Sequence, residues 1–239
     1  MDTIDPFTQH LPTPTANRPL LGLTVLVIED SRFACEAMRL LCLRSGARIR
    51  RADCLRSARR HLQVYRPTIA IIDIGLPDGN GLDLIEELAA ATPRPEALIG
   101  MSGDENAGAA ALQAGAAAFL TKPVMSLATF QETVLNCLPK ERRPSGPRAL
   151  PKEFISPDPI AFQDDMAHAV EILDANHDGR TLDYVAQFLQ GVARSAKDGT
   201  LERAAVNLAT RRAEGASATS EAATLAGIVH QRLTGRIAI

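Results

Sequence analysis

Short apolar runs alternate with helical patterns over the first 140 residues of the chain. The apolar runs, which predict strands, cover residues 24–28, 68–73, 97–102 and 116–120, and residues 47–51 can form a short edge strand. Apolar positions recur at helical spacing, which predicts helices, over residues 31–44, 55–65, 82–91, 106–114 and 127–138. Such alternation is typical of βαβ crossovers. It predicts an α/β fold with a doubly wound, five-stranded parallel sheet and helices on both faces.

The pattern changes after residue 139. Residues 140–150 combine two prolines, a glycine and clustered charge, which is typical of a linker. Beyond them only helical stripes occur, and four helices are predicted around the apolar sets Phe162/Met166/Val170/Leu173, Leu182/Val185/Leu189/Val192, Leu201/Ala205/Leu208 and Leu225/Val229/Leu233. We therefore expect a disordered leader (1–21), an α/β domain (22–139), a linker (140–150) and a small all-helical domain (151–239).

Polar side chains follow the predicted strands where each one ends. Glu29 and Asp30 end the first strand, Asp73 the third and Ser102 the fourth, and Lys122 follows the fifth. Ligands of parallel α/β sheets bind outside the carboxyl ends of the strands, so these side chains are expected to converge. Three carboxylates need a counter-cation, and oxygen ligands in small number suit Mg²⁺. Lys122 and Ser102 can bind anionic oxygens, so the set fits phosphoryl transfer onto a carboxylate.

Four motifs carry a family resemblance. They are V-I-E-D at the first strand, I-I-D-I-G-L-P-D-G-N-G at the third, M-S-G-D at the fourth and A-A-F-L-T-K-P at the fifth. In this order and spacing, residues 22–139 resemble the flavodoxin-like, CheY-like receiver domain of two-component response regulators. The resemblance implies these roles: Asp73 as phospho-acceptor, Asp30 and the Gly75 carbonyl as Mg²⁺ ligands, Glu29 as a ligand through water, Ser102 and Lys122 as phosphoryl partners.

The resemblance also implies a switch. Ser102 would move toward the phosphoryl group, and Phe119, the rotating aromatic, would fill the vacated space. The surface near the last two helices of the α/β domain would then bind or release a partner, for which the C-terminal helices are one candidate. Asp104 lies where the family tunes dephosphorylation, and a cis bond is expected before Pro123.

Composition adds limits on partners and location. The 239 residues carry a net charge of −2 and contain no Trp, which argues against a nucleic-acid-coating protein. The four cysteines form no C-x-x-C pair, so we expect free thiols in a reducing compartment. No segment is apolar enough to span a membrane and the N-terminus does not resemble a signal peptide, so the cytoplasm is the expected location.

The C-terminal helices leave three functions open. Residues 150–239 hold nine Lys and Arg against twelve Asp and Glu, a balance of −3, which makes DNA an unlikely partner. The first hypothesis is a response regulator, not an enzyme beyond its own phosphorylation and dephosphorylation. It accepts phosphate from a sensor histidine kinase or phosphotransfer protein and acts through a downstream protein or a homodimer. The alternatives are a transcriptional regulator with an atypical DNA-binding bundle and a phosphotransfer or enzymatic output.

Three motifs in these helices are discounted. Asp174–Val185 imitates a calcium loop, but Val185 replaces the bidentate Glu. His177-Asp178 imitates a metal phosphohydrolase doublet without a histidine cluster around it. His168 lacks the Lys-Gly that normally follows a phosphotransfer histidine.

Overall fold

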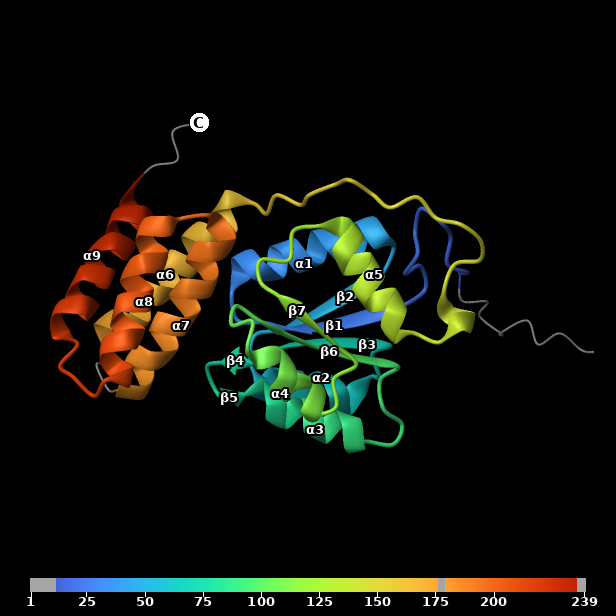
Figure 1. Ribbon diagram of the computed structural model, residues 1–239, viewed down its shortest axis with the longest axis horizontal. Helices are drawn as coiled ribbons and strands as arrows, with labels where there is room; N and C mark the ends of the chain where they lie inside the picture. The colour runs from blue at the N-terminus through green and yellow to red at the C-terminus, as the bar shows by residue number, and fades with distance from the viewer. Residues whose placement is uncertain (1–11, 176–178, 236–239) are drawn as a thin grey trace, which may run out of the picture.

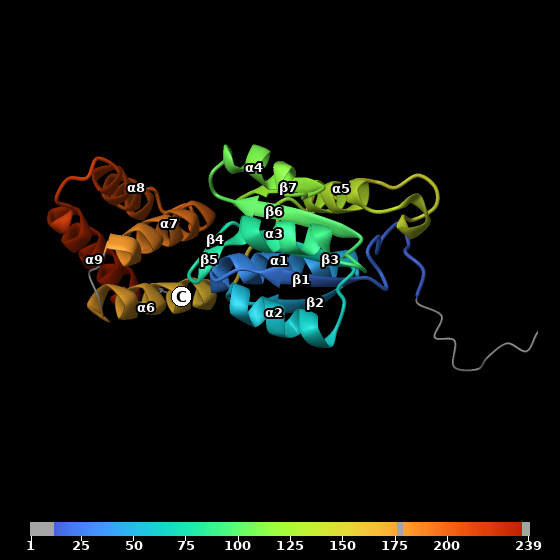
Figure 2. The same ribbon diagram turned by 90° about the horizontal axis from the view of Figure 1, so that it is seen from below.

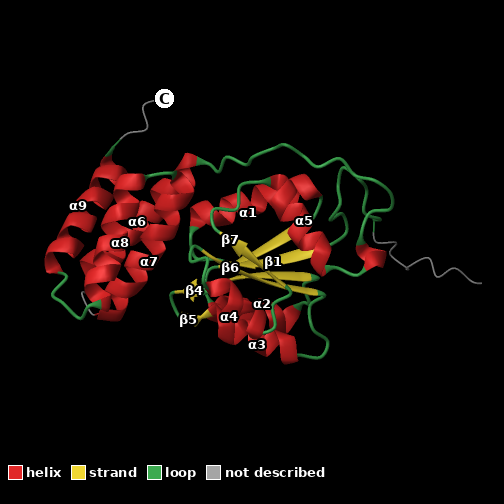
Figure 3. Cartoon of the chain, in the orientation of Figure 1, coloured by secondary structure: helices red, strands yellow, loops and turns green. Residues whose placement is uncertain are grey.

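The computed structural model describes residues 12–175 and 179–235, and its first part is an alternation of strands and helices (Figure 1, Figure 3). The strands of the main sheet are β1 (Thr24–Ile28), β2 (Arg48–Ala52), β3 (Ile69–Asp73), β6 (Ala97–Ser102) and β7 (Ala118–Thr121). The helices between and after them are α1 (Arg32–Ser45), α2 (Leu55–Val64), α3 (Gly81–Ala90), α4 (Ala107–Gln113) and α5 (Leu127–Cys137). The predicted elements are therefore confirmed, with ends that differ by a few residues.

The sheet is parallel throughout, with strand order β2-β1-β3-β6-β7. Because β1 lies at the point where the strand order reverses, the loops after β1 and β3 diverge to opposite faces and leave a crevice. The predicted doubly wound fold is confirmed. A short antiparallel hairpin, β4 (Gly75–Leu76) and β5 (Gly79–Asn80), stands in the loop expected between β3 and α3.

Helices cover both faces of the sheet, so its central strands are apolar on both sides (Figure 1). Helices α1 and α5 pack on one face, where Phe130 and Leu41 are fully buried. Helices α2, α3 and α4 pack on the other, where Leu84 and Ile85 are fully buried. The two aliphatic cores hold the strand ends in register and so position the residues that follow them.

Local sequence explains where α1 begins and ends. The Ser31 side chain accepts a hydrogen bond from the Ala34 N–H and caps the helix start. Gly46 closes the helix with φ at 86°, a left-handed conformation that glycine adopts without a steric penalty. Both residues bound the helix that the apolar spacing predicts.

The segment after α5 stays on the surface of the α/β part. A 3₁₀ turn, η1 (Lys140–Arg142), is followed by extended chain. Ile155 is buried in the α1–α5 core, and its N–H donates to the Met125 carbonyl at 2.8 Å. The chain therefore returns along the sheet domain before the next helix begins.

Four further helices form a bundle beside the sheet domain (Figure 1, Figure 2). They are α6 (Pro159–Ala175), α7 (Gly179–Ala196), α8 (Gly199–Ala213) and α9 (Thr219–Thr234). Each helix contacts two others, α6 with α7 and α9, and α8 with α7 and α9. Their predicted apolar stripes meet in a separate core that includes Met166, Val185, Leu189, Leu208 and Leu225. The all-helical nature of this region is confirmed.

Candidate functional site

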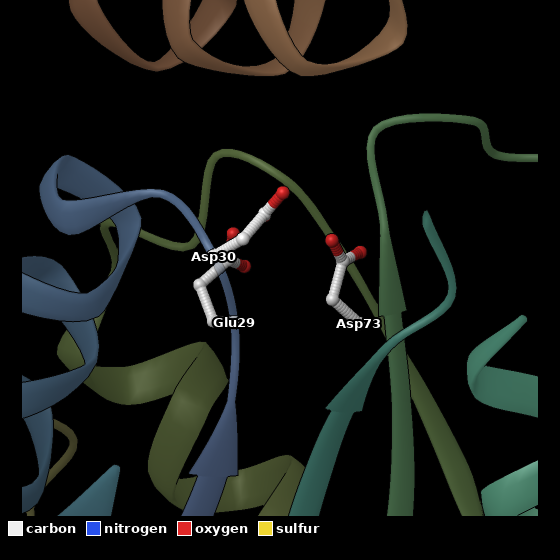
Figure 4. Close-up of side chains that lie close together, drawn as sticks. All are labelled: Glu29, Asp30 and Asp73. Carbon is white, nitrogen blue, oxygen red and sulfur yellow. The ribbon is translucent and has the colours of Figure 1, made fainter. Parts of the chain in front are cut away.

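The predicted acidic residues converge at the carboxyl edge of the sheet (Figure 4). Glu29 and Asp30 directly follow β1, and Asp73 is the last residue of β3. One oxygen from each carboxylate can be chosen so that all three lie within 4.8 Å of one another. Glu29 and Asp73 are buried, with 1% and 5% of their surface exposed. The ends of β1 and β3 thus place three carboxylates close enough together to bind one metal ion.

Lys122 is the cation of this cluster. Its Nζ lies 2.6 Å from Glu29 Oε2 and 3.0 Å from Asp73 Oδ2. The Lys122 N–H donates to the Ser102 carbonyl at 2.8 Å, and the Lys122–Pro123 peptide is cis, as expected. One ammonium therefore faces three carboxylates, which leaves an excess of negative charge when all are ionised.

Burial raises the pKa of all three carboxyl groups. Desolvation raises the pKa of Glu29 to about 7 and that of Asp73 to about 7, although Lys122 acts in the opposite direction on both. Desolvation also raises the pKa of Asp30 to about 6, and the neighbouring Asp73 charge adds to the effect. Burial opposes the charge on Lys122, but Asp73, Glu29 and Asp30 outweigh it and raise its pKa. The cluster therefore favours binding either protons or a cation.

The donor set fits a magnesium ion. The ligand atoms are hard carboxylate oxygens, which Mg²⁺ prefers, and one or two of them suffice because this ion retains several waters. A divalent cation would cancel the negative charge that Lys122 leaves uncompensated. Asp30, Asp73 and Glu29 are thus suited to hold it, with the Gly75 backbone beside them in the same cavity.

Ser102 and Asp104 also line this cavity. Ser102 is the last residue of β6 and is 3% exposed. Its hydroxyl oxygen accepts a 3.1 Å hydrogen bond from the Asp104 N–H. Asp104 Oδ1 in turn accepts from the Asn106 N–H at 2.9 Å, which orders the loop before α4. Both side chains line the same cavity as Asp73.

Phe119 lies away from the cavity. A Cβ placed on Gly108 of α4 would lie 3.2 Å from its ring, and a Cβ on Gly100 of β6 would lie 3.4 Å from it. The ring therefore packs under α4, on the side of the sheet that carries α2 and α3. Among the predicted site residues, it is the one the structure does not bring to the acidic cluster.

Gly81, the last residue of the I-I-D-I-G-L-P-D-G-N-G motif, is a further residue on which the site depends. A Cβ at this position would overlap the backbone carbonyl oxygen of Asp73. The Gly81 N–H also donates to the Ile74 carbonyl at 2.9 Å. The start of α3 therefore touches the backbone of the central acidic residue, and this close approach requires glycine.

The bundle contributes the side chains that sequence reasoning missed. The Tyr184 hydroxyl on α7 donates a 2.7 Å hydrogen bond to Asp30 Oδ2. Burial, and next the Asp30 charge, raise the pKa of Tyr184, so the hydroxyl keeps its proton. Arg194 donates to the Gly103 carbonyl, and the Gln187 amide occupies the space that a side chain at Gly75 would fill. Helix α7 thus lies across the mouth of the acidic cluster.

A second contact joins α6 to the start of α1. Asp165 Oδ2 accepts hydrogen bonds from the Ser31 hydroxyl at 2.7 Å and the Phe33 N–H at 3.1 Å. Its Oδ1 accepts from the Arg32 N–H at 2.7 Å. Asp165 is 1% exposed and directly precedes Met166 of the apolar stripe of α6. An acidic residue directly beside an apolar stripe is a sequence signal that could have indicated this contact.

The bundle does not pack on the surface near α4 and α5 that the switch hypothesis considered. Its helices contact α1 and the β4 hairpin instead, and the views in Figures 1 and 2 agree. His168 also lies outside the acidic cavity, with its ring 5.8 Å from Phe188 in an edge-to-face pair. His177 and Asp178 lie outside the described residues.

Comparison with known proteins identifies the α/β part. Residues 25–134 match the family described as the response regulator receiver domain. This part of the chain is a receiver domain. The predicted family resemblance is confirmed, and the matched segment ends before the bundle begins.

Two curated relatives show how far the similarity extends. The KDP operon transcriptional regulatory protein KdpE of Escherichia coli is 31% identical over 99 residues, covering 41% of this chain and 44% of the relative. The response regulator protein PilR of Pseudomonas aeruginosa is 33% identical over 114 residues, covering 47% of this chain and 25% of the relative. The chain therefore spans less than half the length of these relatives.

Solved receiver structures cover a similar share. A CheY-like receiver domain protein from Methanospirillum hungatei is 23% identical, covers 47% of this chain and 90% of its own, and has a TM-score of 0.42. The receiver domain of a histidine kinase from Syntrophus aciditrophicus is 24% identical, covers 53% of this chain and 98% of its own, and has a TM-score of 0.45.

Two further observations concern both the receiver and the bundle. All four cysteines lie in described segments and are free thiols, as expected. Among residues 12–175 and 179–235, no helix combines the length and apolar character that crossing a bilayer requires.

Proposed function

We propose that this chain is a response regulator that accepts a phosphoryl group on Asp73 and signals through its C-terminal bundle. The observation that carries the proposal is the placement of Asp73 among Asp30, Glu29 and Lys122 at the carboxyl edge of a receiver fold. The phosphodonor is a sensor histidine kinase or phosphotransfer protein, as the receiver fold implies. The proposed setting is a cytoplasmic two-component pathway.

The proposed chemistry uses the carboxylate of Asp73 as nucleophile. As its oxygen forms a bond to phosphorus, the bond from phosphorus to the donor imidazole nitrogen breaks, and that nitrogen keeps the electron pair and takes up a proton. Lys122, 3.0 Å from Asp73 Oδ2, is placed to bind a phosphoryl oxygen, and the Ser102 hydroxyl is placed to donate to another. Mg²⁺ bound by Asp30, Asp73, the Gly75 carbonyl and Glu29 through water would neutralise the phosphoryl charge.

The same proposal assigns the remaining residues. Phosphorylation adds nearly two negative charges, so Ser102 moves toward the phosphoryl group and Phe119 turns into the space that is vacated. Asp104, on the cavity wall, tunes dephosphorylation. We infer that the chain catalyses no reaction beyond gaining and losing this group. The division into a leader (1–21), a receiver (22–139), a linker (140–150) and an output region (151–239) remains part of the proposal.

The output is proposed to act by protein–protein contact or homodimerisation. The named relatives KdpE and PilR are regulators, the first a transcriptional one, but their similarity to this chain lies in the receiver part. The charge of −3 on residues 150–239 favours a protein partner over DNA. A phosphotransfer output is less favoured, because no histidine is among the described residues that line the cavity over Asp73.

The test is acid-labile phosphorylation by acetyl phosphate with Mg²⁺, followed by intact mass. The wild-type chain should gain one phosphoryl group, and Asp73→Asn should gain none. Asp83→Asn is the matched control, since Asp83 is an exposed carboxylate on α3 and should leave labelling unchanged. Labelling that persists in Asp73→Asn would overturn the assignment.

A further inference from the structure

The cavity over Asp73 is lined on one side by the receiver and on the other by the bundle. The receiver side carries Asp30, Asp73, Ser102 and Lys122. The bundle side is one segment of α7, residues 187–194, and the cavity between them measures about 80 Å³. Figure 4 shows the carboxylates of Asp30 and Asp73 directed toward the helix that crosses above them. The bundle therefore lies over the atoms that must react.

A cavity of this size does not admit a protein phosphodonor. The cavity has room for a few water molecules, far less than the volume of a protein domain. Transfer needs a phosphoryl group aligned between the Asp73 oxygen and a donor imidazole, and the imidazole comes with the protein that carries it. That protein would have to pass through α7.

Two of the bundle's polar contacts lie in or directly beside the acidic pair that the receiver needs when it is active. Tyr184 holds Oδ2 of Asp30, a carboxylate suited to bind the cation. Asp165 holds the Ser31 hydroxyl and the first two N–H groups of α1, directly after the acidic pair. A carboxylate at a helix N-terminus is favoured by the helix dipole. Asp165 also carries a desolvation cost, since burial raises its pKa to about 6. The hydrogen bonds that favour docking of the bundle are therefore offset in part by the desolvation of Asp165, so a competing ligand can displace the bundle.

An aromatic contact lies beside these groups. Phe162 of α6 meets Phe33 of α1 edge to face, with ring centroids 6.0 Å apart. The bundle keeps its own core, built from residues such as Leu189 and Leu225. Separation from the receiver would therefore leave both hydrophobic cores in place.

We propose that α6 and α7 occupy the docking surface of the phosphodonor protein, so that the bundle excludes the donor and competes with the cation for Asp30. The surface comprises the start of α1, the loop after β6 at Gly103 and the β4 hairpin at Gly75. The partner it fits is a protein that presents a phosphohistidine. This inference rests on the proposed function. Cation binding and phosphorylation then release the bundle, which exposes the face of α6 and α7 to a downstream partner.

The first test measures Mg²⁺ affinity by calorimetry on the full chain. Tyr184→Phe removes only the hydroxyl that competes for Asp30. In the wild type, Mg²⁺ must displace a hydrogen bond to a charged carboxylate, which is among the stronger kinds of hydrogen bond. Without that bond, the variant should bind Mg²⁺ about tenfold more tightly than wild type. Tyr65→Phe is the matched control, since Tyr65 lies at the end of α2, and should bind like wild type. Equal affinity in Tyr184→Phe and wild type would overturn the competition at Asp30.

The second test follows backbone amide exchange at Arg32 and Phe33, which donate to Asp165 only while the bundle is docked. Exchange of the wild-type chain is compared without additions and with Mg²⁺ plus acetyl phosphate, and intact mass records phosphorylation. Both amides should exchange at least about tenfold faster once Asp73 is phosphorylated. A phosphorylated chain with unchanged exchange would overturn the inference and leave the proposed function standing. A chain that gains no phosphoryl group would overturn the proposed function, and the Mg²⁺ titration of Tyr184→Phe then decides the docking inference by itself.

Discussion

The Tyr184 hydroxyl donates a 2.7 Å hydrogen bond to Asp30 across 154 residues of sequence. Asp30 belongs to the receiver and Tyr184 to the bundle, so this bond joins the two cores at the acidic cluster. Together with the contact of Arg194 with the Gly103 carbonyl, it fastens α7 over the cavity. The contact also links the state of the carboxylates to the position of the bundle, which makes the following outcomes measurable.

Thermal stability of the cation-free protein should fall as the pH rises. The pKa values of Glu29, Asp30 and Asp73 are raised to about 7, 6 and 7, so the folded chain binds protons more tightly than the unfolded chain. The stabilisation is complete below the ordinary carboxyl values and is lost as the pH rises through about 6 to 7. Calorimetric melting between about pH 5 and pH 8 checks this direction.

Mg²⁺ and the substitution Asp73→Asn should each weaken the dependence of the melting temperature on pH. Mg²⁺ replaces the protons as counter-charge, and Asp73→Asn removes one of the three carboxylates. Each should reduce the loss of melting temperature toward pH 8. A melting temperature that rises over the same range without Mg²⁺ would contradict the raised pKa values.

Asp165→Ala should release the bundle from α1 while the neighbouring Asp164→Ala should not. Asp165 is buried and accepts three hydrogen bonds from Ser31, Arg32 and Phe33, and loss of such a cap costs about 0.5–2 kcal/mol. Asp164 forms an exposed ion pair with Arg32 at 2.9 Å, a type worth about 0–1 kcal/mol.

The measurement is the radius of gyration in solution together with the melting temperature. Asp165→Ala should enlarge the chain as the bundle separates, and Asp164→Ala should match wild type. Equal dimensions for the two variants would show that Asp165 does not hold the bundle in place.

Gly81→Ala should destabilise the receiver, because its methyl group would overlap the Asp73 carbonyl oxygen. Overpacking against backbone of this kind costs about 1–3 kcal/mol. Gly227→Ala is the control, since Gly227 lies within α9 with open space around it and alanine favours a helix by about 0.5–1 kcal/mol. Urea unfolding compares the two, and a neutral Gly81→Ala would contradict the close approach.

The sequence by itself determined the receiver fold and most of its acidic cluster. Apolar runs such as 68–73 indicate a parallel sheet, because strands covered by helices on both faces are apolar on both faces. Parallel strands bring their carboxyl ends to one edge, so Asp30, Asp73 and Lys122 could be placed together from their positions after the strands. Gly46 and Ser31 likewise mark the ends of α1 through local hydrogen bonds and backbone conformation. These are short-range rules that a single sequence contains.

Only the tertiary structure decided where the bundle lies and what it covers. Its amphipathic stripes predict helices and a core, but they carry no information about which receiver surface meets the outer face. That choice depends on matched groups far apart in sequence, namely Asp165 with the start of α1 and Tyr184 with Asp30. Phe119 shows the same limit, since its packing under α4 depends on the small glycines opposite it. Docking between two separately formed surfaces is set by shape and hydrogen-bond complementarity, which exist only after both have folded.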